Sequence, residues 1–297
     1  MIEEGDSKDS SADDMSRREF NALLLGAGAA IAGATTSAAA SAPLPVTEKD
    51  VQVKTHAGTA DAVFIAPMSG VYPGVLIWVD AFGVRPAFRT MGRRLAAEGY
   101  SVLVPNPYYR TTRDPHLLPG FSFKNTDDRA KLMGLMGSLS PEAIQEDAVA
   151  YVDFLDAQPQ IKKTVKIGTQ GYCMGGPLTI RAAAARPDRI GAGASFHGGG
   201  LVTDKPDSPH LLIPKMKARF YVGIASNDDK SQPDAKEKLK TAFAEAKLPA
   251  QIEVYDGALH GWCLPDIPSQ DGTPIYNQVQ ADRAWSNLLA LYKATLI

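Results

Sequence analysis

Short runs of apolar residues alternate with amphipathic segments along most of this chain. Continuous apolar runs such as 74–79 and 101–105 are typical of parallel strands that are buried on both faces. The runs at 51–54 and 62–66 predict a short hairpin ahead of them. Further strands are predicted at 164–169, 190–196, 218–225 and 251–255.

Segments with helical spacing lie between these strands. Ser140 and Pro141 suit the N-cap and first position of a helix that runs to about Ala157, and Gly99 is a plausible C-cap for the segment 88–98. The alternation of strands and helices predicts an α/β fold, with a mostly parallel sheet covered by helices on both faces. We expect one domain over residues 45–297. The predicted helices are 88–98, 141–157, 177–185, 234–246 and 278–291.

Two stretches stand out against this pattern. Residues 106–126 are rich in Pro, Arg, Tyr and Asn and predict a long loop, a kind of segment that is often functional. The segment Gly171-Tyr172-Cys173-Met174-Gly175-Gly176 joins the predicted strand at 164–169 to the next helix. It matches the nucleophile-elbow pattern G-x-S-x-G, with Cys in the place of Ser.

The residue types of this turn fit a nucleophile. A β-carbon at Gly171 or Gly175 would clash where the strand and helix backbones come close together. The thiol of Cys173 would lie at a helix N-terminus, which favours a thiolate. The alternative interpretation is a buried structural cysteine in a glycine-rich loop.

Two other predicted strands end in acidic and histidine residues. Functional groups collect at the carboxyl ends of parallel strands, and here Asp228 and Asp229 follow one strand while His260 follows the last. A thiol nucleophile needs a base, and the base needs an orienting carboxylate. We predict His260 as the base and Asp228 as the acid, with Asp229 as the alternative, although both aspartates would also suit a turn.

These blocks resemble the dienelactone hydrolases (carboxymethylenebutenolidases). The resemblance rests on segments 171–176 and 255–263, and also on 79–83 and 105–110, and it covers most of residues 50–295. It implies an α/β-hydrolase fold and a Cys-Asp-His triad, which would hydrolyse an enol-lactone through a thioester acyl-enzyme.

The resemblance also assigns roles to single residues. It makes Cys173 the nucleophile, His260 the general base and then acid, and Asp228 the orienting carboxylate. The N–H groups of Met174 and Ala81 would form the oxyanion hole.

Further roles concern the thiol and the substrate. The family carries a Glu that holds the resting thiol, where this chain has the shorter Asp80. Arg110 matches a position that binds the lactone carboxylate, but residues 205–210 offer no second arginine, so another ester or lactone is an alternative substrate. Four aromatic residues would line an apolar pocket or belong to the core, namely Phe82, Tyr108, Tyr109 and Trp262. We expect His197 to be a structural histidine near the pocket mouth.

Composition narrows the possible partners. The net charge of −2 gives no basic footprint, so nucleic acid is not expected as a partner. The two cysteines, Cys173 and Cys263, do not indicate a disulfide framework. We predict a monomer without cofactor, metal or stable membrane anchor, acting on a small-molecule ester or lactone. The alternatives are a general exported carboxylesterase, a non-catalytic exported binding protein of the same fold, and redox chemistry of the two cysteines.

The N-terminus has the features of a targeting signal. The segment Ser16-Arg17-Arg18-Glu19-Phe20 resembles a twin-arginine export signal, and an Ala/Gly-rich segment follows at 22–34. Cleavage is expected within 38–40 or 40–42, and Met15 is an alternative start because the residues before it are acidic. We therefore predict residues 1–42 as a signal region, the translocation machinery as a partner, and a periplasmic or secreted protein.

Overall fold

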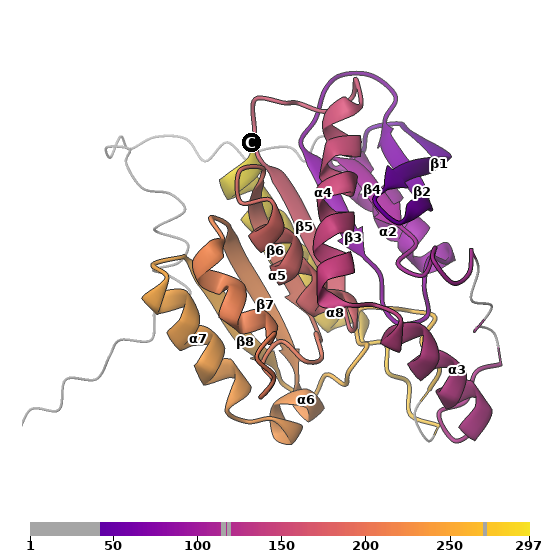
Figure 1. The fold of residues 1–297 in the computed structure, drawn as a ribbon, viewed down its shortest axis with the longest axis vertical. Coiled ribbons are helices and arrows are strands. Elements are labelled where there is room, and N and C mark those ends of the chain that lie inside the picture. The colour runs from indigo at the N-terminus through magenta and orange to yellow at the C-terminus, as the bar shows by residue number, and fades with distance from the viewer. Residues whose placement is uncertain (1–41, 114–116, 118–119, 270–271) are drawn as a thin grey trace, which may run out of the picture. The chain divides into compact units, whose positions relative to one another are not determined.

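Eight strands within the described residues form one sheet. The computed structural model describes residues 42–113, 117, 120–269 and 272–297. The strands are β1 (Val46–Thr55), β2 (Gly58–Pro67), β3 (Gly74–Trp78), β4 (Ser101–Pro105), β5 (Ile167–Tyr172), β6 (Ile190–Phe196), β7 (Arg219–Ala225) and β8 (Ala250–Tyr255). Their order across the sheet is β1-β2-β4-β3-β5-β6-β7-β8 (Figure 1).

The sheet is mostly parallel, as predicted. β1 and β2 form the expected hairpin, and β2 pairs antiparallel with β4. The pairs from β4 through β3, β5, β6 and β7 to β8 are all parallel. Since parallel neighbours run in the same direction, the carboxyl ends of these strands meet at one edge.

Helices cover both faces of the sheet (Figure 1). They are α2 (Pro86–Ala97), α3 (Thr126–Gly137), α4 (Pro141–Ala157), α5 (Gly175–Ala185), α6 (Ser226–Ser231), α7 (Ala235–Glu245), α8 (Gln278–Leu296) and the 3₁₀ helix η1 (Pro209–Lys215). In the view of Figure 1, α4, α5 and α7 lie in front of the sheet, and α2 and α8 lie behind it. None of the helices described is both long and apolar enough to cross a membrane.

Successive residues of β3 enter different cores. Leu76 and Trp78 belong to the cluster that includes Tyr151 of α4, whereas Val75 and Ile77 belong to the cluster that includes Phe88 of α2. Alternation of side chains along a strand therefore explains the continuous apolar run.

The predicted helix ends are largely confirmed. The Ser140 side chain accepts a hydrogen bond from the N–H of Ala143, and Pro141 occupies the first turn of α4. Gly99 follows α2 with φ of 91°, a conformation that costs glycine little. The strand predicted at 164–169 lies further along the chain, because β5 begins at Ile167 and ends at Tyr172, next to the elbow.

Three elements were not expected. These are α3, α6 and η1. Apolar side chains in α3 do not share one face, since Leu132 and Leu135 are buried while Met133 is exposed. Its N-cap is Asn125, which accepts from the N–H groups of two residues in the first turn. The domain predicted for 45–297 falls in the compact unit Ala42–Ile297, and the signal region predicted for 1–42 lies outside the described residues except for Ala42.

Candidate active site

The turn between β5 and α5 is a tight elbow around Cys173. Cys173 has a φ of 52°, which is uncommon for a residue other than glycine. A β-carbon at Gly171 would lie 2.0 Å from the carbonyl oxygen of Gly175, and one at Gly175 would lie 2.3 Å from that of Trp78. Both distances are far below van der Waals contact, so the structure confirms the steric reason for these two glycines.

His260 and Asp228 lie side by side at the same edge of the sheet. His260 is in the loop after β8, Asp228 is in α6 directly after β7, and His260 Nδ1 is 2.7 Å from Asp228 Oδ2. The His260 N–H also donates to Asn227 Oδ1 at 2.8 Å. Asp229 points elsewhere, because its carboxylate accepts hydrogen bonds from Lys236 at 2.8 and 2.9 Å.

The His260 ring interacts with both the Asp228 carboxylate and the Cys173 thiol. Burial alone would lower the pKa of His260, but hydrogen bonds with Asp228 and Cys173, together with their charges, outweigh burial and raise its pKa to about 10. The imidazole is therefore stabilised in its protonated form by acidic groups on two sides. Such an arrangement can move a proton between a thiol and a bound molecule.

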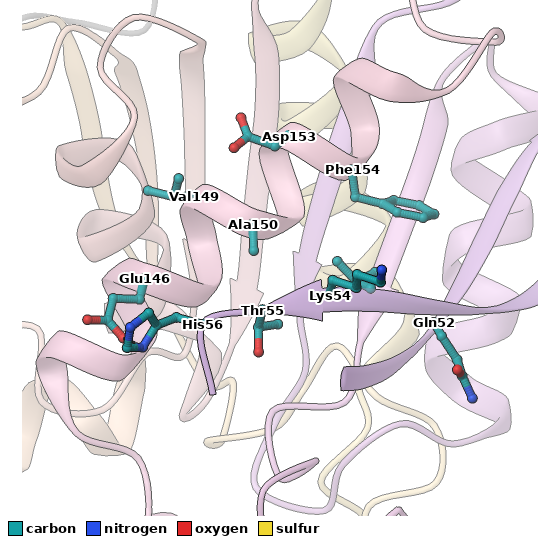
Figure 2. A pocket seen from close by; sticks show the side chains of 10 residues that line it. Gln52, Lys54, Thr55, His56, Glu146, Val149, Ala150, Asp153 and Phe154 are labelled. Carbon is teal, nitrogen blue, oxygen red and sulfur yellow. Dashed lines mark ion pairs between the residues drawn. The ribbon is translucent and has the colours of Figure 1, made fainter. Parts of the chain in front are cut away.

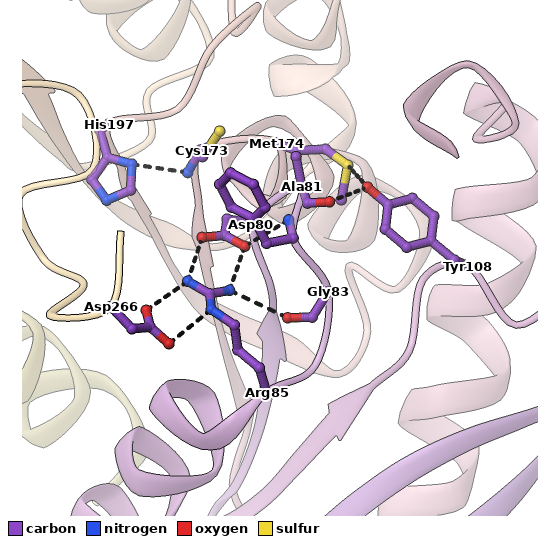
Figure 3. A network of polar contacts seen from close by, with 10 residues as sticks. Asp80, Ala81, Gly83, Arg85, Tyr108, Cys173, Met174, His197 and Asp266 are labelled. Atoms are coloured by element: carbon purple, nitrogen blue, oxygen red, sulfur yellow. Dashed lines mark hydrogen bonds and ion pairs between the residues drawn. The ribbon is translucent and has the colours of Figure 1, made fainter. Parts of the chain in front are cut away.

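The two residues predicted as oxyanion donors are held together by Tyr108 (Figure 3). The Tyr108 hydroxyl donates to the carbonyl oxygen of Ala81 at 2.9 Å and lies 3.2 Å from Sδ of Met174. Within the described part of the chain, the N–H groups of Ala81 and Met174 donate no hydrogen bond to another protein group. Both N–H groups are thus free to donate to a bound molecule.

Asp80 is part of a buried ion-pair network rather than a contact of the thiol. The Asp80 carboxylate receives two hydrogen bonds from Arg85, at 2.6 and 2.9 Å, and one from the N–H of Phe82 at 2.9 Å. Arg85 also binds both oxygens of Asp266, each at 2.9 Å (Figure 3). Burial raises the pKa of Asp80, although Arg85 opposes this. The role predicted for Asp80 at the resting thiol therefore has no contact in this structure to support it.

An apolar wall lies beside the elbow. Phe82 and Phe121 pack edge to face with ring centroids 5.0 Å apart, and they share a cluster with Met174 and, at its edge, Cys173. The long loop after β4 and helix α3 supply much of this wall. Its buried members are Ala81, Phe82, Tyr108, Leu117, Phe121, Leu132, Leu135 and Met174.

Two residues predicted to bind substrate have internal partners instead. Arg110 forms a fork with Asp147 of α4, with distances of 2.6 and 2.9 Å, and the Asp147 side chain is fully buried. Trp262 is fully buried, stacks on Tyr255 with centroids 4.8 Å apart, and so belongs to the core rather than to an open pocket. The pattern of the sequence could not distinguish these cases, because it shows neither the distant Asp147 partner of Arg110 nor how deeply Trp262 is buried.

His197 is the site residue that the sequence indicated least clearly. It follows β6 directly, and its Nδ1 accepts a hydrogen bond from the N–H of Cys173 at 3.1 Å (Figure 3). Its ring lies 5.1 Å from that of His260, centroid to centroid. The signal available in the sequence was its position at the end of the strand next to the elbow strand.

The cavities differ in their relation to this site. One, of about 670 Å³, lies between β1 and α4 and is lined by residues such as His56 and Glu146, remote from Cys173 in the sheet (Figure 2). One of about 410 Å³ is lined by Cys263 and Trp285. A third, of about 310 Å³, has Met174 in its wall and so adjoins the elbow. Among the described residues no group of three or more His, Cys, Asp or Glu side chains is placed to hold a metal ion.

Comparison with known proteins identifies the fold and the family of this chain. The fold is that of the α/β-hydrolases, since a solved structure from Klebsiella pneumoniae titled a putative dienelactone hydrolase superposes with a TM-score of 0.70 at 21% identity, covering 84% of this chain and 98% of the other. Residues 60–296 match the model of the Dienelactone hydrolase family, and the chain belongs to that family.

Relatives of known sequence agree with this assignment. A Synechocystis protein named "Putative carboxymethylenebutenolidase" is 26% identical over 230 residues, which is 76% of this chain and 88% of that protein. A protein of the same name from Escherichia coli K12 is 26% identical, covering 75% of this chain and 78% of the other. A dienelactone hydrolase-like promiscuous phosphotriesterase from metagenomic libraries has the same fold, with a TM-score of 0.70 at 21% identity, covering 85% of this chain and all, 100%, of that one.

Proposed function

We propose that this protein is a cysteine-dependent hydrolase of carboxylic esters or lactones. The observation that carries the proposal is the His260 ring, which is hydrogen-bonded to Asp228 and whose pKa is raised by both Asp228 and Cys173. A thiol, an imidazole and a carboxylate in this order form a nucleophile with its base and the group that orients the base.

The first half of the reaction forms an acyl-enzyme. The Cys173 thiolate attacks the carbonyl carbon, and the N–H groups of Met174 and Ala81 stabilise the oxyanion, each donor contributing about 3 kcal/mol to barrier lowering. The intermediate then collapses, the carbon–oxygen bond to the leaving group breaks, and the His260 imidazolium gives its proton to the departing alkoxide. In a lactone, that alkoxide remains part of the acyl group.

The second half releases the acid. Neutral His260 takes a proton from water, and the hydroxide attacks the thioester carbon. Collapse of the second intermediate breaks the carbon–sulfur bond, leaving a carboxylic acid and the thiolate. One ester bond and one water are consumed, and Asp228 keeps the imidazole in one orientation throughout.

The surroundings favour an apolar acyl or alcohol group. Phe82, Phe121 and Leu135 cover the elbow, and burial of such surface against substrate contributes about 25 cal/mol per Å². Arg110 is not needed in this proposal, because Asp147 occupies its guanidinium. An uncharged ester or lactone is therefore the preferred substrate class.

The test is a substrate panel on the purified protein. p-Nitrophenyl esters of increasing chain length and an enol-lactone are assayed with the unmodified protein, with Cys173→Ala, and with Cys263→Ala as the matched cysteine control. We expect kcat to fall at least about 1,000-fold in Cys173→Ala and to stay within about twofold in Cys263→Ala, whose thiol is not part of the mechanism. Activity of Cys173→Ala equal to that of the unmodified protein would exclude this mechanism.

We also propose export through the twin-arginine route. The support is the segment Ser16-Arg17-Arg18-Glu19-Phe20, which lies in the undescribed N-terminal region. Replacement of Arg17 and Arg18 by lysine should keep the protein in the cytoplasm, as measured by cell fractionation. Unchanged export of this variant would contradict the proposal.

A further inference from the structure

His197 contacts the backbone of the proposed nucleophile, Cys173. It is fully buried, has a φ of 40°, and its own N–H donates to the carbonyl oxygen of Gly223 at 2.8 Å. Its ring contacts Trp262 edge to face at 5.0 Å and His260 at 5.1 Å between centroids. One imidazole thus lies against the backbone of the nucleophile and the ring of the base.

The N–H of Cys173 is held by the chain segment that contains His197. It lies 3.1 Å from His197 Nδ1 and also 3.1 Å from the carbonyl oxygen of Phe196. These two acceptors fix the peptide plane that precedes Cys173. Because a non-glycine residue at positive φ costs about 1–3 kcal/mol, such a plane persists only when its surroundings hold it.

The hydrogen bond defines the protonation state of His197. An N–H donor requires a lone pair on Nδ1, so the ring is neutral and carries its proton on Nε2. Burial lowers the pKa of His197 well below its usual value, and the nearby charge of His260 lowers it further. The titratable groups around the ring are His260, Cys173 and Tyr172, the last at 5.9 Å between centroids.

The environment of Nε2 indicates that the ring is retained for the hydrogen bond at Nδ1. His197 Nε2 is buried, and among the described residues it has no hydrogen-bond partner. An unsatisfied buried donor costs about 1–3 kcal/mol, which an apolar side chain of similar size would avoid. Within the part of the chain that the structure describes, the hydrogen bond that Nδ1 accepts from the N–H of Cys173 is the one that this ring makes.

We propose that His197 is a positioning residue of the active site, whose neutral Nδ1 holds the Cys173 backbone in the orientation that brings the thiol to His260. This inference rests on the proposed hydrolase function. It predicts that activity depends on a hydrogen-bond acceptor at position 197, and that the imidazole itself and its titration are not required.

A matched pair of variants tests this. In His197→Asn the amide oxygen can take the place of Nδ1, and asparagine tolerates positive φ; His197→Leu has a similar shape without an acceptor. We expect kcat of His197→Asn within about threefold of the unmodified protein. His197→Leu should lose about 10- to 100-fold in kcat with KM within about twofold, as for a small misplacement of reacting groups.

Alkylation separates this inference from the function itself. Iodoacetamide reacts with Cys173 whether or not the protein hydrolyses esters, and its rate should fall at least about tenfold in His197→Leu but stay near the original in His197→Asn. If Cys173→Ala retains full esterase activity, the proposed function fails, and these alkylation rates still decide the role of His197.

Three results would overturn the inference. The first is full activity and full alkylation rate in His197→Leu. The second is a kcat more than tenfold lower in His197→Asn, once near-UV circular dichroism has shown that this variant is folded. The same variant decides the matter if His197→Leu does not fold. The third is a shift of the acid limb of the kcat/KM profile in His197→Asn, because that shift would mean that His197 titrates.

Discussion

The hydroxyl of Tyr108 donates to the carbonyl oxygen of Ala81 at 2.9 Å and lies 3.2 Å from Sδ of Met174. These are the two residues whose N–H groups stabilise the oxyanion in the proposed mechanism. One side chain from the loop after β4 therefore contacts both a residue after β3 and a residue after β5.

Tyr108→Phe should loosen this arrangement without removing either donor. A net hydrogen bond of this kind is worth about 0.5–1.5 kcal/mol, so we expect kcat to fall about 2- to 10-fold with KM nearly unchanged. Steady-state kinetics on a p-nitrophenyl ester measures this. Tyr109→Phe, whose hydroxyl binds Asp147 instead, is the control, and an equal loss in both variants would contradict the argument.

Removal of Arg85 should destabilise the fold because it leaves a buried carboxylate without its partner. The Arg85 and Asp80 side chains are 9% and 2% exposed. Loss of one partner of a buried pair costs about 3–5 kcal/mol. Urea unfolding of Arg85→Leu should show this loss, and Asp80→Asn in the same chain should restore part of it. No gain in stability from the second change would contradict the assignment of the pair.

Asp228→Asn should change how activity depends on pH. Because His260 must donate a proton to the leaving group, activity is lost as pH rises through its pKa of about 10. The Asp228 carboxylate helps to raise that pKa, so its replacement should move the alkaline limb of the kcat/KM profile to lower pH. Asp229→Asn, which removes a partner of Lys236, should leave the limb in place.

The same pKa shift has a consequence for stability. A raised pKa in the folded state means that the protonated His260 stabilises the fold fully below its usual value of 6.5, and that this contribution is lost as pH rises from there through about 10. The difference in unfolding free energy between the unmodified protein and His260→Gln should therefore shrink between pH 6.5 and 10. A difference that does not change with pH would contradict the shift.

Arg110→Gln should affect stability more than catalysis. Among the described residues, the Arg110 guanidinium and the Tyr109 hydroxyl donate hydrogen bonds to the fully buried carboxylate of Asp147. We expect a lower midpoint of urea unfolding and a kcat/KM on neutral esters within about threefold of the original. A KM that rises more than tenfold for a carboxylate-bearing lactone would instead show that Arg110 binds substrate.

The sequence predicted those features that depend on neighbouring residues. The elbow, the hairpin and the cap at Ser140 are local, since glycine geometry and capping act within a few residues. The predicted order of Cys173, Asp228 and His260 was also readable, because strand ends in a parallel sheet gather at one edge. This rule is sufficient to predict that His260 and Asp228 lie close together.

Long-range pairing was beyond the reach of the sequence. Asp80 and Arg85 are close along the chain, but Asp266, the second partner of Arg85, is 181 positions away. Arg110 has a carboxylate partner 37 positions on, in α4. Helix α3 was missed because only two of its side chains are buried, in a wall completed by Phe82 and Met174 from other elements.

The close packing around the elbow separates positions that evolution can change from those that it cannot. At Gly171 and Gly175 any side chain would overlap a backbone carbonyl, so these positions are closed to substitution. Cys173, between them, is only half-buried, and serine differs from it by one atom. A single-nucleotide exchange could therefore convert a thiol enzyme into a hydroxyl enzyme on an unaltered scaffold, which would make the identity of the nucleophile one of the easiest traits for this lineage to vary.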